Sequence, residues 1–171
     1  MNGEVLIEGD PSHERWIQIA LEYVPEEVLA NEGGNLAIIG LGGIGGCRLP
    51  AQYRQREIVL LSDWVFPPAG HSEGDDTGRF FVITLLHEIA HAVCRHKSPR
   101  LDQLSPDDSQ AQEDEADRIA VQWFNRRVEL SGNEFMTPTD ATEFREIVER
   151  LEPLFADIED FKAQWHSGSG T

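Results

Sequence analysis

Residues 80–93 read FFVITLLHEIAHAV and predict a long buried helix. Wound at about 100° per residue, this helix gathers its apolar residues on one side, namely Val82, Ile83, Leu86, Ile89, Ala90 and Val93. His87 and His91 fall on the adjacent side, one helical turn apart, with roughly 5–6 Å between their Cβ atoms. Glu88 lies beside them. The pattern therefore predicts two imidazoles and one carboxylate along one edge of a core helix.

These three side chains suit metal-assisted hydrolysis. Two imidazoles at positions i and i+4 can bind one metal ion, and a carboxylate between them can accept a proton from metal-bound water, whose pKa falls to about 7. The simpler alternative is a pair of hydrogen-bonded core histidines, since an unpaired buried polar group costs several kcal/mol. We expect His87 and His91 to be metal ligands and Glu88 to be the general base.

A second predicted helix supplies a third ligand. The Ser-Pro pair at 105–106 is typical of a helix start, and the helix that follows has an apolar stripe of Ala116, Ile119, Ala120, Trp123 and Phe124. Glu113 projects from inside this stripe, so we expect its carboxylate to point toward the core and to need a cation there. Asp117, one turn later, is placed to hydrogen-bond a ligand histidine. Asp114 and Glu115 are expected on a solvated face.

The motif HEIAH at 87–91, followed by EDEAD at 113–117, resembles the HExxH plus ExxAD pairing of gluzincin zinc metallopeptidases. The resemblance covers roughly Arg56 to Phe124. It implies a zincin-like fold, a zinc ion bound by two histidines and a glutamate, and hydrolysis of peptide bonds in a peptide or protein substrate.

Within the gluzincins, the chain is nearest to the ImmA/IrrE-like or minimal peptidases, on the strength of Arg79-Phe80 and the 22-residue spacing from His91 to Glu113. Arg95-His96 resembles the CAAX-protease branch instead, so the subfamily stays open. A metzincin would need a histidine at position 97, and His96 is one position out of register.

Residues 56–62, REIVLLS, are predicted to form a strand from their apolar and β-branched content. Peptidases of this type hold an extended substrate on an exposed edge strand. An ordinary sheet strand without a substrate role is equally compatible with the sequence.

A different function is suggested by the strand at 36–40, which runs into the GxGxxG pattern Gly40–Gly45 of dinucleotide-binding proteins, with Asp63 near the position of a ribose-binding acid. That pattern needs a helix opening on the glycines, and Pro50 opposes a helix there. We therefore interpret Gly40–Gly45 as a flexible hairpin or loop between two strands. Nucleotide binding remains the less favoured alternative.

The length of 171 residues and a hydrophobic content of 40% suit one α+β domain over 1–166, with a disordered tail at 167–171. We expect a short twisted sheet packed on the HExxH helix and the second ligand-bearing helix, followed by a C-terminal helical region capped by Thr139-Asp140. Further helices are predicted from Asp10-Pro11 to Pro25 and up to Gly33. The segment 67–78 is predicted to be a loop.

The net charge of −17 disfavours direct binding of nucleic acid and favours basic partners, although solubility alone would also account for it. Without an apolar run long enough to span a bilayer or a secretory signal at the start, the cytoplasm is the expected location. Two cysteines imply no disulfide framework. The oxyanion donor is left open among Tyr53, His71 and Arg118, the oligomeric state is not set, and a zinc-bearing regulatory module without catalysis is a further alternative.

Overall fold

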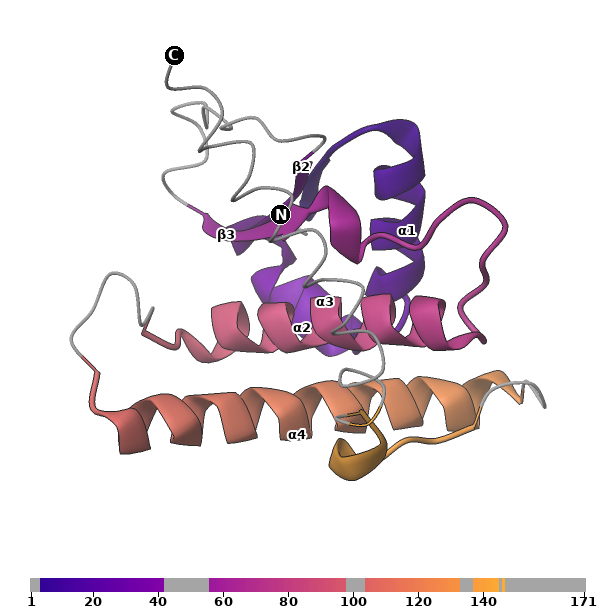
Figure 1. The fold of residues 1–171 in the computed structure, drawn as a ribbon. Helices are drawn as coiled ribbons and strands as arrows, with labels where there is room; N and C mark the ends of the chain where they lie inside the picture. Colours follow the sequence, from indigo (N-terminus) through magenta and orange to yellow (C-terminus); the bar gives the residue numbers. More distant parts are fainter. Residues whose placement is uncertain (1–3, 42–55, 98–103, 133–136, 145, 147–171) are drawn as a thin grey trace, which may run out of the picture.

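The computed structural model describes residues 4–41, 56–97, 104–132, 137–144 and 146. In chain order its elements are β1 (Leu6–Glu8), α1 (Pro11–Leu21), α2 (Glu26–Glu32), η1 (Gly33–Asn35), β2 (Leu36–Leu41), β3 (Glu57–Ser62), η3 (Asp63–Val65), α3 (Asp76–Cys94) and α4 (Pro106–Ser131). Residues 141–144 are also helical. The expected α+β class is confirmed, and α3 and α4 lie side by side in opposite directions on one side of the sheet (Figure 1).

The described strands form a parallel sheet in the order β1-β2-β3. Neighbouring residues of a strand face opposite sides of the sheet. One face contributes to the main core through Leu36, Ile38, Val59 and Leu61. The other face carries a small second cluster around Ala37 and Ile39. β1 was not predicted, because three residues are too few to show a period.

The parallel pairing of β2 with β3 corrects the expectation of a possible hairpin at the glycines. A short hairpin joins only antiparallel strands, whereas parallel strands need a crossover. Residues 42–55, which include most of that pattern and Tyr53, lie outside the described residues. Parallel strands are also what a dinucleotide fold would need, but Asp63 is already engaged, since its Oδ1 lies 2.8 Å from Nε2 of the buried His13.

The start of α1 and the end of α2 lie where the local signals predict, whereas α1 ends at Leu21, four residues before the predicted end at Pro25. The Asp10 carboxylate accepts hydrogen bonds from the backbone N–H groups of Ser12 and His13, at 2.8 and 3.0 Å, and so caps α1. Proline at position 11 suits the first turn, where no N–H partner is required. Gly33 ends α2. These ends are encoded by residues within one helical turn.

The helix that carries the HEIAH motif, α3, starts at a cap that joins it to the preceding loop. The Asp75 carboxylate accepts hydrogen bonds from the N–H groups of Gly78, at 2.9 Å, and Ser72, at 2.8 Å. The predicted loop therefore ends earlier than position 78. At its other end the helix stops at Arg95, whose φ of 55° is left-handed.

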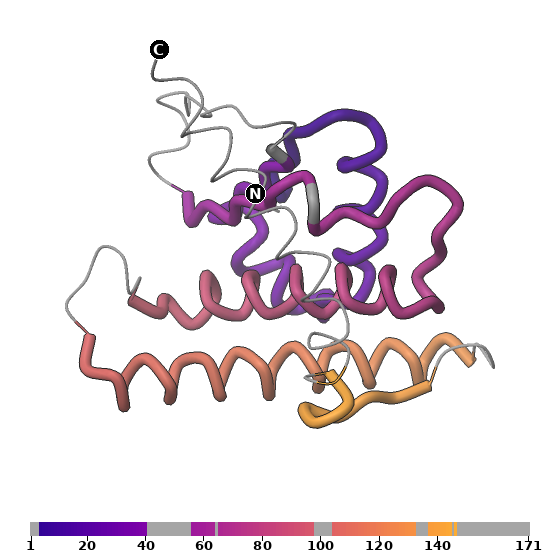
Figure 2. Tube along the Cα trace, viewed as in Figure 1, coloured from indigo at the N-terminus to yellow at the C-terminus, as the bar shows by residue number. Residues whose placement is uncertain are grey.

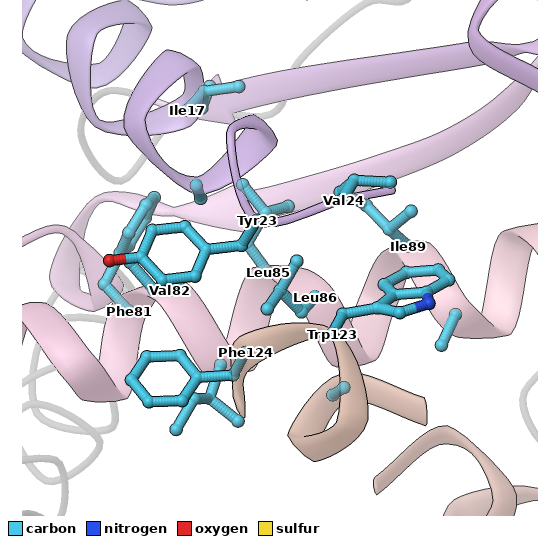
Figure 3. Packing of buried hydrophobic residues seen from close by; sticks show 14 of the residues in the cluster. Ile17, Tyr23, Val24, Phe81, Val82, Leu85, Leu86, Ile89, Trp123 and Phe124 are labelled. Carbon is cyan, nitrogen blue, oxygen red and sulfur yellow. The ribbon is translucent and has the colours of Figure 1, made fainter. Parts of the chain in front are cut away.

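The core lies between the sheet, α1 and α3, and continues to α4. Trp16 of α1 meets Phe81 of α3 edge-on, with ring centroids 5.7 Å apart. Tyr23 stacks on Phe124 of α4 with centroids 5.3 Å apart (Figure 3). The buried Ala116 is small enough to let two helix backbones approach closely. The antiparallel α3–α4 pair (Figure 2) is therefore held by apolar contact from Ala116 of α4 onward.

Among the described residues, none of the helices combines the length and the apolar character needed to cross a bilayer. The long α4 reaches 26 residues, but its exposed face is strongly charged. Its buried residues are confined to one stripe, as expected for a helix that packs through one face.

Candidate metal centre

The two histidines of the HEIAH motif aim the same ring atom at one point. Nε2 of His87 and Nε2 of His91 lie 2.9 Å apart, and the rings meet edge-on with centroids 4.6 Å apart. This geometry follows from the one-turn spacing on α3. The core side of the same helix is filled by Leu86, Ile89 and Ala90, so both rings are directed away from the apolar core.

Glu113 brings the third donor from α4. Its Oε2 lies 3.3 Å from Nε2 of His87 and 3.6 Å from Nε2 of His91. For metal bonds of about 2.0–2.2 Å in a tetrahedral site, donors sit roughly 3.3–3.6 Å apart. The three distances, from 2.9 to 3.6 Å, are therefore close to what such an ion needs. The donor atoms thus form a group able to hold a metal ion.

One detail of the Glu113 prediction is wrong. The side chain does not point into the apolar core, since it is 45% exposed and opens onto a pocket beside the histidines. The buried residues of α4 begin at Ala116, and the part of the helix before it, which carries Glu113, is mostly polar. The angular argument selected the residue that lies beside the two histidines, but it did not predict that the side chain is exposed to a pocket.

Asp117 supports His87 from one turn further along α4. Its Oδ1 lies 2.8 Å from Nδ1 of His87. A carboxylate at this distance takes the Nδ1–H of a neutral imidazole and leaves the Nε2 lone pair free. The contact has the geometry that was anticipated for this residue.

His91 has a matching contact that sequence reasoning missed. Nδ1 of His96 lies 2.8 Å from Nδ1 of His91, and Nε2 of His96 lies 3.3 Å from Oε2 of Glu115. Glu115 was expected only on a solvated face. His96 lies two residues beyond the end of α3, close enough in sequence to reach back to His91. This contact could have been predicted only if the end of the helix at Cys94 had been known.

Glu88 lines the same pocket and is exposed to it. Although its side chain meets solvent, the surrounding protein removes enough water to raise the pKa of Glu88; His87 opposes the rise and Glu113 adds to it. Desolvation, followed by the nearby His87, lowers the pKa of His91. Partial desolvation thus shifts the pKa of both Glu88 and His91, which line the same pocket.

The pocket beside the three donors has a volume of about 580 Å³. The lining includes residues 57–60 of β3, the last strand in the order of the described sheet, together with the donors and Glu88. A larger pocket of about 690 Å³ lies between α1 and residues 67–73 and contains none of these donors. Size alone would therefore select the wrong pocket, because the titratable groups converge on the smaller one.

Two of the oxyanion candidates are placed elsewhere. His71 lines the larger pocket, where its Nδ1 lies 3.2 Å from Oδ2 of Asp75. Arg118 is 64% exposed and pairs with Glu115 at 3.7 Å. Neither lines the pocket beside the donors, and Tyr53 lies outside the described residues.

Comparison with known proteins adds a likeness to one protein family over part of the chain. No curated protein and no solved structure matches the chain. The model of one family, described as Peptidase U49, matches residues 81–148, which is less than half of the chain but includes both donor-bearing segments. Over this stretch the chain is similar to a family of peptidases.

Proposed function

We propose that this protein is a zinc-dependent peptidase. In this proposal His87, His91 and Glu113 bind the ion, Glu88 is the general base and Asp117 orients His87. The observation that carries it is the convergence of three donor atoms from two helices beside a pocket, within a segment similar to a peptidase family.

The donor set favours zinc over harder cations. Two imidazole nitrogens and one carboxylate oxygen are common ligands of catalytic zinc, whereas Mg²⁺ and Ca²⁺ prefer a shell of oxygens. The spacing of the three donors fits the bond lengths of zinc, and all three residues line the pocket, so an ion held by them would be accessible from it. When bound there, zinc would polarise the substrate carbonyl and lower the pKa of a water molecule.

The protein's own residues then do the rest of the chemistry. Glu88 takes a proton from the attacking water and passes it to the nitrogen of the leaving amine, so the peptide C–N bond breaks as a C–O bond forms. The Asp117 carboxylate holds the proton of His87 on Nδ1, which keeps Nε2 available as a donor. Desolvation raises the pKa of Glu88, which strengthens the hold of its carboxylate on the proton that it takes from water.

The edge strand β3 is placed to bind the substrate. Among the described strands it pairs only with β2, and its residues 57–60 line the pocket. An extended peptide could add, through backbone hydrogen bonds, to the edge of β3 at which no described strand lies. Leu60, which is 49% exposed, offers an apolar surface next to such a peptide. We therefore expect peptides or unfolded segments of proteins as substrates.

The test begins with elemental analysis of protein purified without added metal. We expect one zinc per chain, cleavage within a mixed peptide library followed by mass spectrometry, and loss of cleavage in Glu88→Gln by about 10²–10⁴-fold with zinc retained. Glu129→Gln, an exposed glutamate near the end of α4, is the matched control and should cleave normally.

The other outcomes separate the competing functions. Bound zinc without cleavage of any peptide would indicate a regulatory or binding module. Thermal stabilisation by NAD or ATP, with none by zinc, would indicate nucleotide binding instead. Cleavage that survives in Glu88→Gln would contradict the assigned general base.

A further inference from the structure

His96 sits where α3 ends and the chain turns back over the donor histidines. Arg95 takes a left-handed conformation, and the His96 backbone N–H then donates to the carbonyl of His91 at 3.0 Å. This is the Schellman-type ending in which the chain folds over the last helical turn. The His96 side chain is only 8% exposed, so the ring is held beside His91 rather than in solvent.

The positions of the protons on the rings of His91 and His96 can be assigned from the groups that each ring nitrogen faces. A neutral imidazole has one N–H, and the nitrogen that binds a metal cannot carry it. If Nε2 of His91 is the donor to the ion, Nδ1 of His91 carries the proton. Nδ1 of His96, 2.8 Å away, must then accept it. The proton of His96 is left on Nε2, which faces Oε2 of Glu115 at 3.3 Å.

We propose that His96, held by Glu115, is a positioning residue for His91. This proposal rests on the proposed function, since it takes His91 as a metal ligand. The arrangement parallels the role of Asp117 toward His87: each donor ring has its Nδ1–H accepted by a partner, and each keeps Nε2 for the ion. His96 differs from Asp117 because its acceptor is an uncharged ring nitrogen. The ring of His96 is itself held in place by the carboxylate of Glu115.

The same assignment argues against a second ion at this place. Cys94, His96 and Glu115 also bring donor atoms within 4.8 Å of one another. An ion bound to Nε2 of His96 would move the ring's proton to Nδ1, directly opposite the protonated Nδ1 of His91. Two N–H groups would then face each other at hydrogen-bond distance. Binding there and binding by His91 through Nε2 would therefore oppose each other.

Zinc affinity, measured by competition with a chromophoric chelator, tests the proposal. His96→Phe keeps the ring volume and removes the acceptor, so we expect zinc affinity to fall by about 10–100-fold, as for other partners of metal-binding histidines. His96→Asn places an amide oxygen near the position of Nδ1, and we expect it to retain most of the affinity. Glu115→Gln should weaken binding less than His96→Phe, and Asp114→Asn, its exposed neighbour, should not weaken it.

Two further measurements exclude a merely structural effect. The melting temperature of the metal-free protein should be similar in His96→Phe and His96→Asn, while the visible spectrum of cobalt-substituted protein should change in the phenylalanine variant alone. Equal zinc affinity of His96→Phe and the unchanged protein would overturn the proposal. So would two zinc ions per chain, one of them lost in both His96→Asn and Cys94→Ser. Absence of zinc from the unchanged protein would instead contradict the proposed function itself.

Discussion

Gly78 provides a sharp test of how α3 is positioned, because helix propensity and packing predict opposite results there. In a helix interior, replacing glycine by alanine normally stabilises by about 0.5–1 kcal/mol. A Cβ added at Gly78, however, would lie 2.0 Å from the carbonyl oxygen of Ser72 and 2.8 Å from Cα of Glu73. Both are backbone atoms, so no side-chain rotation can relieve the clash.

The size of the effect follows from these distances. Separating the loop from the helix to a normal contact of about 3.5 Å means a shift of more than an ångström, and overpacking of this kind costs roughly 1–3 kcal/mol. The shift also strains the cap that Asp75 provides, because its carboxylate bonds both Gly78 and Ser72. We therefore expect Gly78→Ala to lose about 1–3 kcal/mol of stability, with the sign opposite to that of propensity.

Urea denaturation and thermal melting measure this change. For a protein of this size, each kcal/mol corresponds to about 2–4 °C in melting temperature, so a drop of roughly 2–12 °C is expected. Thr77→Ala, one residue earlier in the same turn, is the control and should stay within about 0.5 kcal/mol of the unchanged protein. A rise in melting temperature for Gly78→Ala would refute the reasoning, since it would mean that the loop does not press on the helix start.

Two further outcomes concern the cap and the metal centre. Burial works to raise the pKa of Asp75, but hydrogen bonds from Ser72, Gly78 and His71 outweigh it and lower the pKa below 3.8. The charge on Asp75 thus stabilises the fold above its unfolded pKa and ceases to do so as the pH falls through the lowered folded value. The difference in unfolding free energy between the unchanged protein and Asp75→Asn should shrink on acidification to about pH 3, and a constant difference would contradict this. Asp117→Ala should weaken zinc binding by about 10–100-fold, measured by chelator competition, and unchanged affinity would show that the contact with His87 does not support the ion.

The helices and their ends were largely predictable. The caps at Asp10 and Ser105 and the glycine that ends α2 are where the sequence signals put them. The strands at 36–41 and 57–62 were also found, because their apolar and β-branched runs are local features. The direction in which these strands pair was not predicted, since a hairpin and a crossover connect the same two patterns.

In the candidate site, too, some features could be predicted from the local sequence and others could not. His87 and His91 could be paired from their spacing alone, because residues one helical turn apart share a face of any straight helix. The exposure of Glu113 could not be predicted, since it depends on how α4 packs against α3. The two residues that meet there, His87 and Glu113, are far apart in sequence. The role of His96 was missed for a related reason: its ring reaches His91 only because the helix ends and the chain reverses at Arg95.

The amino-acid order by itself therefore specified the caps of α1 and α4, the strands β2 and β3 and the paired imidazoles, since each depends on residues within about one turn or one strand. Packing decided the parallel direction of the sheet, the approach of Glu113 to the histidines and the contact between His96 and His91. The physical reason is distance along the chain. Contacts between separate elements form only when burial of the shared apolar core brings those elements together, and no local pattern encodes that geometry.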